Sequence, residues 1–582
     1  MKRIVVVKKE KCNPLACGNY TCIRFCPVNR KGEECIFKSD DKKVSVKEEL
    51  CIGCNICVMK CPFNALSIVN LPEALDKEPI HRYCENGFAL FNLPTPIFGK
   101  VVGIIGRNGI GKSTAIKILA GLLKPNLGKI GHEATHRELI EYFKGTEAQG
   151  FLEKKNRGEI VVSYKPQQVD FIPKRFKGTV KELLEKTDEK NQLVEVAKIL
   201  ELEKVLDHDI DKISGGELQR VAIAATVLKK ANVYFFDEPT SYLDIKQRIK
   251  VSKFIRSLAD EKTAVMVIEH DLIILDYLAD LIHLMYGKEA GYGIASMVKT
   301  TKTGINVYLS GMLHDENIRF RDYEIKFMRK PVREQAEGKV ISEWKKLRFR
   351  QGSFTLDIND GKIHKDDVIG ILGENGIGKT TFVKILAGVI KTDDEIKDLK
   401  VSYKPQYLEA SEELVMAVLH KAKQKYDSMI IKPLDLDGLL LRKLNELSGG
   451  ELQRVAIAYC LSQDADLFLL DEPSAYLDVE QRLLVSKVIK DLMVLKGKSA
   501  LIVDHDLLFI DYLSDKLVVF EGEPAVSGTV KGPFKMEEGM NHFLSELEMT
   551  FRRDEENSRP RANKPGSVKD REQKSAGKLY YC

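Results

Sequence analysis

Two glycine-rich segments carry the residue types that bind the phosphates of a nucleotide. Each follows a run of apolar residues, 101–105 in the first copy and 368–372 in the second, and each ends in Gly-Lys followed by Ser or Thr. The glycines let backbone amides wrap around phosphates at a helix N-terminus, the lysine reaches the terminal phosphates, and the hydroxyl binds Mg²⁺. The residues expected to contact nucleotide are Gly106, Asn108, Gly109, Gly111, Lys112, Ser113 and Thr114, and then Gly373, Asn375, Gly376, Gly378, Lys379, Thr380 and Thr381.

Each glycine-rich segment is followed by an Asp-Glu pair at the end of an apolar run. The aspartates suit a metal ion, and the expected Mg²⁺ ligands are Ser113 and Asp237 in the first copy and Thr380 and Asp471 in the second. A carboxylate beside the metal can orient and polarise the attacking water, and phosphoryl transfer depends mostly on such positioning. Glu238 and Glu472 are therefore the candidate general bases.

An amide and an imidazole complete each set. Gln167 and Gln406 end two identical Ser-Tyr-Lys-Pro-Gln strings and are expected to sense the metal and the water. His270 and His505 each end a strand pattern, where an imidazole can hydrogen-bond a γ-phosphate. A single histidine would more often be structural, but its repetition at the equivalent position favours a role in catalysis.

An eleven-residue string, Ser-Gly-Gly-Glu-Leu-Gln-Arg-Val-Ala-Ile-Ala, occurs at residues 214–224 and again at 448–458. It resembles the signature of ATP-binding-cassette (ABC) ATPases, in which the serine hydroxyl and glycine amides contact the γ-phosphate of ATP held by an opposing cassette. The resemblance implies two composite ATP sites. Ser448, Gly450 and Asp478 would complete the first site, and Ser214, Gly216 and Asp244 the second.

Nine of the twelve cysteines lie between Cys12 and Cys61, in two runs of four and one outside them. The second run has the C-x2-C-x2-C-x3-C-P spacing of a bacterial ferredoxin, in which the fourth cysteine of a run ligates the other cluster. We therefore expect two [4Fe-4S] clusters. The expected ligands are Cys12, Cys17, Cys22 and Cys61 for one cluster and Cys26, Cys51, Cys54 and Cys57 for the other.

The alternative to clusters is zinc, which prefers Cys-x2-Cys pairs separated by a longer loop. A four-cysteine run that ends in proline suits a tetrahedral zinc site poorly. No flavin or nicotinamide fingerprint follows the cysteines, which favours a structural or mechanical role for the clusters over electron transfer. The cysteines outside both runs, Cys35, Cys84, Cys460 and Cys582, are given no role, since a lone cysteine is most often a small buried hydrophobe.

Composition limits the class of protein only loosely. A chain of 582 residues exceeds what one hydrophobic core supports, so three or four domains are expected. The net charge of +6 permits contact with a polyanion without arguing for one. No apolar run approaches the ~18 residues of a membrane-spanning helix, and the N-terminal run is too short for a signal peptide, which predicts a cytoplasmic protein with no membrane partner.

The two copies differ in the number of residues between the glycine-rich segment and the glutamine of the Ser-Tyr-Lys-Pro-Gln string. Gln167 lies 61 positions after Gly106, whereas Gln406 lies 33 after Gly373. The extra residues fall at about 128–158 and are predicted to form a helix-loop-helix, with helices over 136–143 and 147–155 and Thr146 as a cap. A tolerated surface insertion is the alternative. Exposed Tyr142, Phe143 and Phe151 would favour a docking element instead.

A mixed, basic segment follows each copy. The first includes residues 317–322, and the second, residues 551–582, has nine Lys or Arg against five Asp or Glu. Both are interpreted as hinges that could brace the cassette interface and present positive charge to phosphate. Such charge runs are usually solvated surface, so they favour nucleic acid only weakly.

These observations predict an α/β protein with two P-loop ABC nucleotide-binding domains in a head-to-tail arrangement and an N-terminal α+β ferredoxin-like domain. The expected domains are residues 1–75 with the clusters, 76–290 as the first nucleotide-binding domain, 291–335 as hinge 1, 336–525 as the second nucleotide-binding domain, and 526–582 as hinge 2 with the C-terminal segment.

The whole pattern resembles the ribosome-recycling ABC ATPases of the RNase L inhibitor family, from residue 11 to residue 574. Distinctive stretches are 61–72, 81–83, 143–147 and 241–248 beside the two signatures, and Ile213 replaces the usual leucine before the first signature. The resemblance implies an ATPase that closes on a post-termination or rescued ribosome and separates its subunits. It implies as partners the small subunit with its rRNA and ribosomal protein, a release factor or its rescue paralogue, and initiation factors, with the protein itself a monomer.

Two rival functions use the same motifs. The ATPase subunit of a membrane transporter shares every cassette motif, but twin fused cassettes without a spanning segment and the N-terminal cysteines argue against it. An iron-sulfur electron carrier powered by ATP would require the clusters to change redox state during turnover. The relative activity of the two ATP sites, the ribosomal contacts and the adenine-stacking residue stay open, with Phe91 as a guess for the last.

Overall fold

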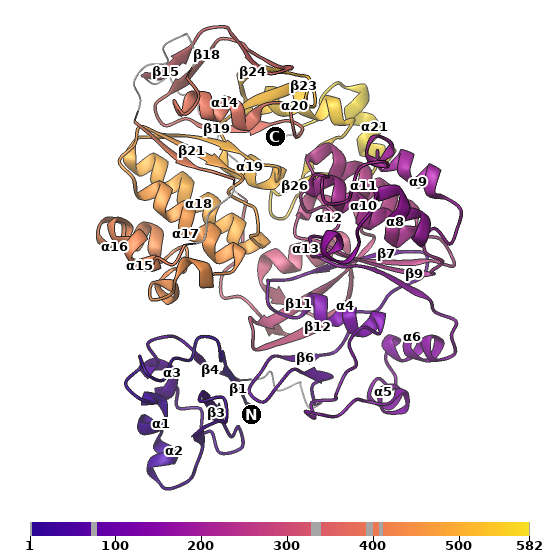
Figure 1. Ribbon diagram of the computed structural model, residues 1–582, viewed down its shortest axis with the longest axis vertical. Helices are drawn as coiled ribbons and strands as arrows, with labels where there is room; N and C mark the ends of the chain where they lie inside the picture. Colours follow the sequence, from indigo (N-terminus) through magenta and orange to yellow (C-terminus); the bar gives the residue numbers. More distant parts are fainter. Residues whose placement is uncertain (1–2, 71–77, 328–338, 392–399, 407–410, 581–582) are drawn as a thin grey trace. The chain divides into compact units, whose positions relative to one another are not determined.

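The computed structural model describes residues 3–70, 78–327, 339–391, 400–406 and 411–580. The chain forms two compact units, one of Met1–Tyr242, Lys250–His270 and Leu278–Ile325, and the other of Leu243–Ile249, Asp271–Tyr277 and Lys326–Cys582. Each unit contains one eight-stranded sheet. Figure 1 shows helices beside the strands of each sheet.

The cysteine-rich N-terminal region is built from short elements that group together in Figure 1. These are β1 (Arg3–Val7), α1 (Thr21–Phe25), α2 (Pro27–Arg30), β2 (Ile36–Lys38), β3 (Val44–Val46), α3 (Ile56–Lys60) and β4 (Leu66–Asn70). Strands β1 and β4 pair antiparallel, as do β2 and β3. Helices α1 and α3 each begin after a residue in the left-handed conformation, Tyr20 and Asn55, and each carries a buried cysteine.

The N-terminal region is joined to the rest of the first unit by buried polar contacts. The Asn86 side chain accepts from the Val46 amide and donates to the Val46 carbonyl, at 2.8 and 2.9 Å. Arg82 forms a bidentate ion pair with Glu48, at 2.5 and 3.1 Å. Because Asn86 is buried and the Arg82–Glu48 pair is partly buried, these contacts fix the region's attachment more firmly than exposed ion pairs would.

The first eight-stranded sheet has the order β5-β6-β12-β11-β7-β10-β9-β8. Its strands are β5 (His81–Arg82), β6 (Ala89–Phe91), β7 (Val101–Ile105), β8 (Val162–Lys165), β9 (Val233–Asp237), β10 (Ala264–Ile268), β11 (Leu281–Lys288) and β12 (Tyr292–Thr300). Strands β7, β9 and β10 are buried along their whole length, as continuous apolar runs predict for parallel strands covered on both faces. Their carboxyl ends lie at one edge, where parallel α/β sheets bind ligands.

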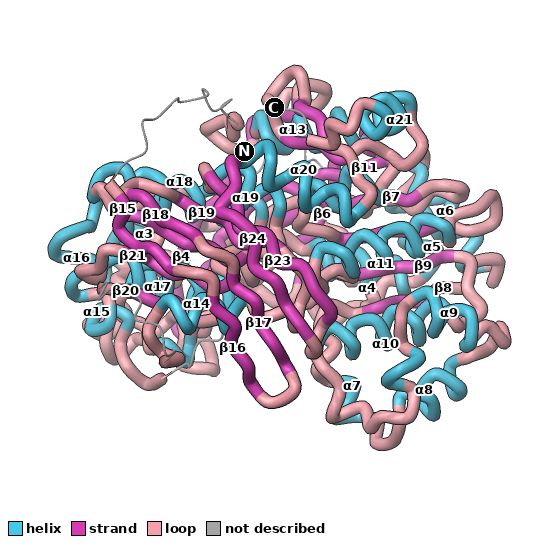
Figure 2. The backbone as a smooth tube through the Cα atoms, turned by 90° about the horizontal axis from the view of Figure 1, so that it is seen from above, coloured by secondary structure: helices cyan, strands magenta, loops and turns pink. Residues whose placement is uncertain are grey.

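The second sheet repeats the same order as β16-β17-β24-β23-β19-β22-β21-β20. Its strands are β16 (Leu347–Gln351), β17 (Phe354–Ile358), β19 (Val368–Leu372), β20 (Val401–Lys404), β21 (Leu467–Asp471), β22 (Ser499–Val503), β23 (Lys516–Glu523) and β24 (Ser527–Lys535). Figure 2 shows β16, β17, β24 and β23 side by side. The irregularity between His283 and Met285 in β11 recurs between Leu517 and Val519 in β23, so the repeat extends to details of register.

The helices also follow a common order in the two copies. The first copy has α4 (Lys112–Ala120), α5 (His136–Tyr142), α6 (Glu147–Asn156), α7 (Ile172–Arg175), α8 (Val180–Thr187), α9 (Leu193–Ile199), η1 (Glu203–Val205), α10 (Gly215–Val227), α11 (Ile245–Ser257), α12 (Leu272–Leu278) and α13 (Thr301–Ser310). The second has α14 (Lys379–Leu386), α15 (Val415–Val418), α16 (His420–Tyr426), the short turns η2 (Asp427–Ile431), η3 (Asp437–Leu439) and η4 (Leu444–Glu446), then α17 (Gly449–Ser462), α18 (Val479–Lys496), α19 (Leu507–Leu513), α20 (Met536–Leu547) and α21 (Val568–Ser575).

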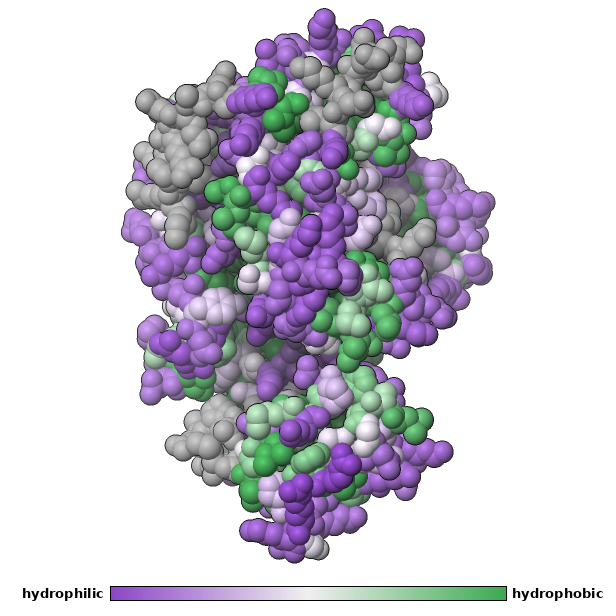
Figure 3. All heavy atoms as spheres, turned by 90° about the vertical axis from the view of Figure 1, so that its left-hand side faces the viewer, coloured by the Kyte–Doolittle hydropathy of each residue, from purple (hydrophilic) through white to green (hydrophobic). Residues whose placement is uncertain are grey.

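Small two-stranded pairs complete the described chain. They are β13 (Met312–Leu313) with β14 (Ile318–Arg319), β15 (Val340–Trp344) with β18 (Gly361–His364), and β25 (Phe551–Arg553) with β26 (Pro560–Ala562). On the face drawn in Figure 3, hydrophilic side chains cover most of the described surface and hydrophobic ones lie in separate groups between them. None of the described helices is long and apolar enough to span a bilayer.

Candidate functional site

The first glycine-rich segment lies between the end of β7 and the start of α4, as its sequence predicts. Gly111 precedes the helix at a φ of 89°, and a side chain there would collide with Phe88, since an added Cβ would lie 2.6 Å from the ring. Lys112 Nζ donates to the carbonyls of Gly106 and Arg107 at 2.9 and 2.6 Å. The lysine therefore lies across its own loop, where phosphate oxygens would bind.

The second glycine-rich segment has the same geometry between β19 and α14. Gly378 has a φ of 96°, and Lys379 Nζ donates to the carbonyls of Gly373 and Glu374 at 2.7 and 2.6 Å. Burial lowers the pKa of Lys379 to about 8 even though neighbouring carboxylates oppose this. The energetic cost of the buried charge would fall when phosphate oxygens pair with it.

The aspartates that end β9 and β21 meet the hydroxyl that opens each helix. Thr380 Oγ1 donates to Asp471 Oδ2 at 3.0 Å, and the Ser113 side chain hydrogen-bonds Asp237. Burial raises the pKa of both aspartates. Asp237 Oδ1 is buried and has no hydrogen-bond partner among the residues that the structure describes. Such a hydroxyl and carboxylate pair fits a hard, oxygen-loving cation.

The candidate bases Glu238 and Glu472 lie one residue beyond these aspartates and face the predicted partners. Gln167 Nε2 donates to Glu238 Oε1 at 2.7 Å, and His270 Nε2 lies 3.3 Å from the same oxygen. In the second copy Gln406 Nε2 donates to Glu472 Oε1 at 2.7 Å, and His505 Nε2 lies 3.6 Å away. The structure therefore brings together within each copy the glutamate, glutamine and histidine that the sequence singles out.

The two glutamates nevertheless differ in their ionisation. Burial favours the neutral form of Glu238, but hydrogen bonding to His270, the charges of His270 and Lys112 and the bond from Gln167 outweigh it and lower the pKa to about 2. For Glu472 burial prevails over the hydrogen bond from Gln406 and raises the pKa. His505 is itself kept neutral, because burial holds its pKa well below the usual range. The two copies thus shift the pKa of the candidate base in opposite directions.

The two signature strings form exposed helix N-termini. Ser214 and Ser448 cap α10 and α17 in reciprocal capping boxes with Glu217 and Glu451, a pattern that the Ser-x-x-Glu spacing signals. Both serines are exposed, and the glycines Gly216 and Gly450 lie in the first turn. Helix N-termini with free amides suit an anion. Asp244 and Asp478 each accept from the amide three residues on, at 2.9 Å.

The eight predicted cluster ligands surround two separate pockets in the N-terminal region. Cys12, Cys17, Cys22 and Cys61 line one pocket, and Cys26, Cys51, Cys54 and Cys57 line the other. This is the grouping that ferredoxin-type spacing predicts, with the last cysteine of each run crossing over. Among the described residues no three Cys, His, Asp or Glu side chains are placed to hold a single metal ion, so these pockets fit a larger group better than they fit zinc.

The cysteines outside the runs have different surroundings. Cys35 is buried, lines the second pocket, and lies within hydrogen-bonding reach of Cys26 and Cys51. Cys460 is a buried hydrophobe as predicted, whereas Cys84 is exposed, which contradicts that expectation. Cys84 opens a tight turn closed by a hydrogen bond from Gly87 to its carbonyl, and a turn of this kind lies at the surface. Cys582 lies outside the described residues.

The guess that Phe91 contacts adenine is not supported by its position. Phe91 is 2% exposed in β6 and packs edge-to-face on Tyr292, so it belongs to the core. Tyr83 is half-exposed instead, and its hydroxyl lies 3.0 Å from Thr114 Oγ1 on the phosphate-binding helix. Sequence reasoning missed this aromatic residue, although its short His-Arg-Tyr string is distinctive.

The insertion in the first copy forms the predicted pair of helices, α5 and α6. Thr135 caps α5 with Glu138 in a capping box that was not predicted. Thr146 precedes α6, but its hydroxyl donates to the Phe143 carbonyl at 2.7 Å and does not cap the helix, so the predicted capping bond is wrong. The threonine stabilises the turn between the helices instead.

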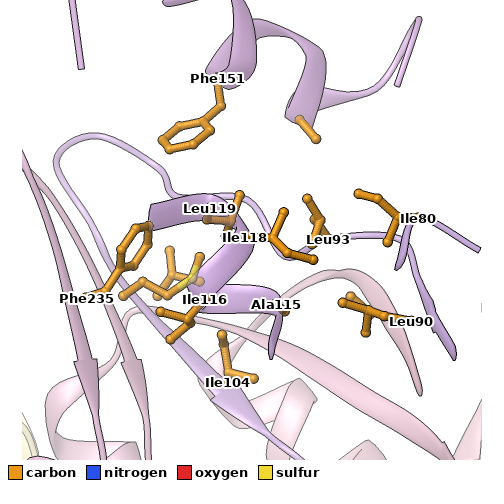
Figure 4. Close-up of a cluster of buried hydrophobic side chains, with 14 of the residues drawn as sticks. Ile80, Leu90, Leu93, Ile104, Ala115, Ile116, Ile118, Leu119, Phe151 and Phe235 are labelled. Atoms are coloured by element: carbon orange, nitrogen blue, oxygen red, sulfur yellow. The ribbon is translucent and has the colours of Figure 1, made fainter. Parts of the chain in front are cut away.

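The aromatic side chains of the insertion face inward, which removes the observation that would have favoured a docking element. Phe143 and Phe151 are 2% and 5% exposed, and Tyr142 is partly buried. Figure 4 shows Phe151 directed toward Leu119 and Ile118 of α4, the helix that follows the first glycine-rich segment. Lys155 of α6 also donates to the Leu119 carbonyl. The insertion is therefore packed onto the nucleotide-binding core.

The basic segments present less charge than their composition suggests. Arg321 is buried and donates to the carbonyls of Tyr308, Leu309 and Tyr323. In the C-terminal segment Arg553 pairs with Asp511 at 2.7 and 2.9 Å. Because these arginines already bond to acceptors of their own chain, they are not placed to bind phosphate. The basic residues still exposed near the C-terminus are Lys564, Lys569, Arg571, Lys574 and Lys578.

Comparison with family models identifies the class of protein. Residues 97–241 and 356–475 match the ABC transporter model, residues 44–67 the 4Fe-4S binding domain, and residues 3–34 a possible Fer4-like domain in RNase L inhibitor. The molecule is thus an ABC ATPase with an N-terminal iron-sulfur region, and the predicted enzyme class is confirmed.

Relatives extend over the whole chain. An uncharacterised ABC transporter ATP-binding protein of Methanocaldococcus jannaschii is 50% identical over 100% of this chain and 97% of its own length. Translation initiation factor RLI1 of Saccharomyces cerevisiae is 43% identical over 100% of this chain and 98% of its own. The chain belongs to the E family of ABC proteins, the RNase L inhibitor family, which confirms the predicted family.

Solved structures agree over the same extent. The protein in a model of ribosome-bound archaeal Pelota and ABCE1 is 53% identical, with a TM-score of 0.93 over 100% of this chain and 99% of that one. The recycling factor aABCE1 in a complex with the archaeal ribosomal stalk protein aP1 is 54% identical, with a TM-score of 0.84 over 87% of this chain and 100% of that one. The predicted fold class, two P-loop domains with a ferredoxin-like region, is confirmed.

Proposed function

We propose that this ATPase is a ribosome recycling factor that separates post-termination or rescued ribosomes into subunits and links them to initiation. The observation that carries the proposal is full-length similarity, at a TM-score of 0.93, to a protein described as ribosome-bound ABCE1 beside Pelota. The translation initiation factor RLI1 supports the link to initiation, since it is 43% identical along the whole chain.

The chemistry would be hydrolysis of ATP at two composite sites. Lys112 and Lys379 would bind the terminal phosphates, with Ser448, Gly450 and Asp478 completing the first site and Ser214, Gly216 and Asp244 the second. Mg²⁺, held by Ser113 with Asp237 and by Thr380 with Asp471, would neutralise phosphate charge when bound.

At each site the glutamate would orient and polarise water, and the glutamine would hold that carboxylate. The 2.7 Å bonds from Gln167 to Glu238 and from Gln406 to Glu472 support this assignment. His270 and His505 would hydrogen-bond the γ-phosphate, for which their places beside the same carboxylates are suited. Such positioning is the main contribution a protein makes to phosphoryl transfer.

The N-terminal region would hold two [4Fe-4S] clusters, one in each cysteine pocket, as rigid structural elements. The proposed domains are 1–75 for this region, 76–290 and 336–525 for the two nucleotide-binding domains in head-to-tail arrangement, and 291–335 and 526–582 for the hinges. Movement of the cluster region, driven by closure on ATP, would push the ribosomal subunits apart.

The proposed partners are the small ribosomal subunit, through rRNA and ribosomal protein, a release factor or its rescue paralogue, and initiation factors. The exposed lysines and arginine of the C-terminal segment supply charge for rRNA phosphate. The protein would act in the cytoplasm as a monomer.

Co-sedimentation tests the proposal against the transporter alternative. Full-length, cluster-loaded protein would be centrifuged with ribosomes or with lipid vesicles, in the presence of ADP or a non-hydrolysable ATP analogue. The proposal expects binding to ribosomes that depends on the nucleotide, and no binding to vesicles. Protein that stays in the supernatant with ribosomes under both nucleotides, or that pellets with vesicles, would contradict it.

A further inference from the structure

The backbone carbonyl of each candidate base receives hydrogen bonds from two buried side chains that have no part in the mechanism above. In the first copy, Lys165 Nζ donates to the Glu238 carbonyl at 3.2 Å and to the Asp237 carbonyl at 3.0 Å. Gln219 Nε2 donates to the same Glu238 carbonyl at 2.7 Å. Lys165 and Gln219 are each 0% exposed.

The second copy builds the same arrangement from its own residues. Lys404 Nζ donates to the Asp471 and Glu472 carbonyls at 2.7 and 3.4 Å, and Gln453 Nε2 donates to the Glu472 carbonyl at 2.7 Å. Both side chains are 1% exposed. The same pair of donors therefore meets the same carbonyl in both copies.

The lysine comes from the edge strand and the glutamine from the signature helix. Lys165 ends β8, whose register places it beside Phe236 of β9, and Gln219 lies in the second turn of α10. Ser163, two residues earlier on the same face of β8, donates to the Thr226 carbonyl of α10 at 2.7 Å. The glutamate is thus the point at which the edge strand, the metal-binding strand and the signature helix meet.

Burying the lysine ammonium at this position costs free energy, because the charge is removed from water. Burial is the main cause that lowers the pKa of Lys165 and of Lys404 to about 8, against the attraction of nearby carboxylates. An apolar side chain of similar length would fill the space without that cost. The lysine ammonium, unlike an apolar side chain, can donate to two adjacent carbonyls at once.

The backbone of the base itself needs such support. Glu238 and Glu472 have φ values of 48° and 47°, in the left-handed region, where a residue with a side chain is strained. Their amides donate to Ile268 and Val503 at 3.0 and 2.8 Å. With the carbonyl bonded as well, the peptide groups on both sides of the residue are held, and the carboxylate is directed at its glutamine.

We propose that Lys165 with Gln219, and Lys404 with Gln453, are positioning residues that hold the candidate base in its left-handed conformation and so aim its carboxylate at the attacking water. Because the glutamine belongs to the helix that begins at the signature serine, the same contact ties the signature helix to the base of its own copy. The proposal rests on the assignment of Glu238 and Glu472 as general bases.

Steady-state hydrolysis by full-length, cluster-loaded protein tests the proposal in the double variant Lys165→Met, Lys404→Met. A misdirected carboxylate should lower kcat by ~10- to 100-fold. The affinity for ADP should change by less than about threefold, because the contacts that the change removes are those to the carbonyls of the Asp-Glu pair. The matched control is Ser163→Ala with Ser402→Ala, which loosens the same strand from the same helix without touching the glutamate, and which should leave kcat unchanged.

Combination with Glu238→Gln and Glu472→Gln separates positioning from general stability. If the lysines act through the glutamates, adding the lysine changes to the glutamine variants should cause no further loss of kcat. Losses that multiply, a wild-type kcat in the methionine variant, or an equal loss in the serine control would overturn the proposal. If the methionine variant fails to fold, Gln219→Met with Gln453→Met, which removes the other donor, decides by the same criteria.

Different results would contradict the assignment of the bases and the positioning role. Wild-type hydrolysis by the Glu238→Gln, Glu472→Gln protein would overturn both the assigned bases and the positioning role. Slow hydrolysis by that protein together with full activity of the lysine and glutamine variants would overturn the positioning role alone.

Discussion

At the scale of single residues, the two copies use the same side chains in unequal electrostatic settings. His270 Nε2 lies 3.3 Å from Glu238, whereas His505 Nε2 lies 3.6 Å from Glu472. The first glutamate has a pKa of about 2, and the second has a pKa raised by burial. A base is active only when ionised, so the two sites should respond differently to acid.

The pH dependence of hydrolysis in single-site variants measures this difference. In Glu238→Gln only Glu472 can act as the base, and in Glu472→Gln only Glu238 can. A raised pKa means that Glu472 takes up its proton first as the pH falls. We therefore expect kcat of Glu238→Gln to decline at a higher pH than kcat of Glu472→Gln. If kcat of the two variants declined at the same pH, or in the reverse order, the expected difference between Glu238 and Glu472 would be wrong.

At the scale of elements, the cysteine runs are interleaved between the two pockets. Cys57 and Cys61 are only four residues apart in and after α3, yet they line different pockets. Conversely, Cys12 and Cys61 are far apart in sequence but line the same one. Because β1 pairs with β4, the two ends of the region meet. This pairing allows the last cysteine of each run to line the pocket of the other run.

The iron content of double cysteine variants tests this assignment of the cysteines to two clusters. Two [4Fe-4S] clusters give roughly eight iron atoms per chain. We expect Cys12→Ser with Cys61→Ser to keep about half of the iron, because both changes damage one cluster. Cys57→Ser with Cys61→Ser should lose nearly all of it, because the changes fall on different clusters. Equal iron in the two double variants would mean that the pockets do not correspond to separate clusters.

Much of the site is predictable because each motif is a short run of neighbouring residues, even where the motifs themselves lie far apart in sequence. The helix that starts at Lys112 and the strand that ends at Asp237 follow from glycines and apolar runs. The grouping of cysteines follows from spacing in the same way. Contacts between distant segments are different, because a pattern in one segment does not show what packs on it.

The insertion and the buried lysines illustrate that limit. The helices of the insertion are amphipathic, but sequence alone does not say whether Phe151 faces solvent or α4, and the structure buries it. Lys165 reads as an ordinary polar residue in Ser-Tyr-Lys-Pro-Gln, and only the fold reveals that it is buried against two carbonyls. The contact between Tyr83 and Thr114 is not predictable for the same reason, because the two residues belong to separate strings.

At the scale of the whole molecule, two matching ATPase copies and one cluster region lie in a single chain, and we propose that they act together on the ribosome. Both copies share the strand order, the hydrogen bond from the glutamine to the candidate base, and the second glutamine that donates to the carbonyl of that base. Among the described residues, the cluster region and the helices of the insertion have no counterpart in the second copy, so the two halves of the chain are unequal. We therefore expect hydrolysis at the two ATP sites to drive one process, the separation of the ribosomal subunits.

Separation of ribosomes into subunits, followed on sucrose gradients with wild-type protein and with Glu238→Gln and Glu472→Gln separately, tests this claim most directly. We expect ATP and wild-type protein to convert intact ribosomes into subunits, and each substitution to alter either that conversion or the release of the protein from the small subunit. Ribosomes that stay intact with wild-type protein and ATP, or two variants that both behave as the wild type does, would contradict the account.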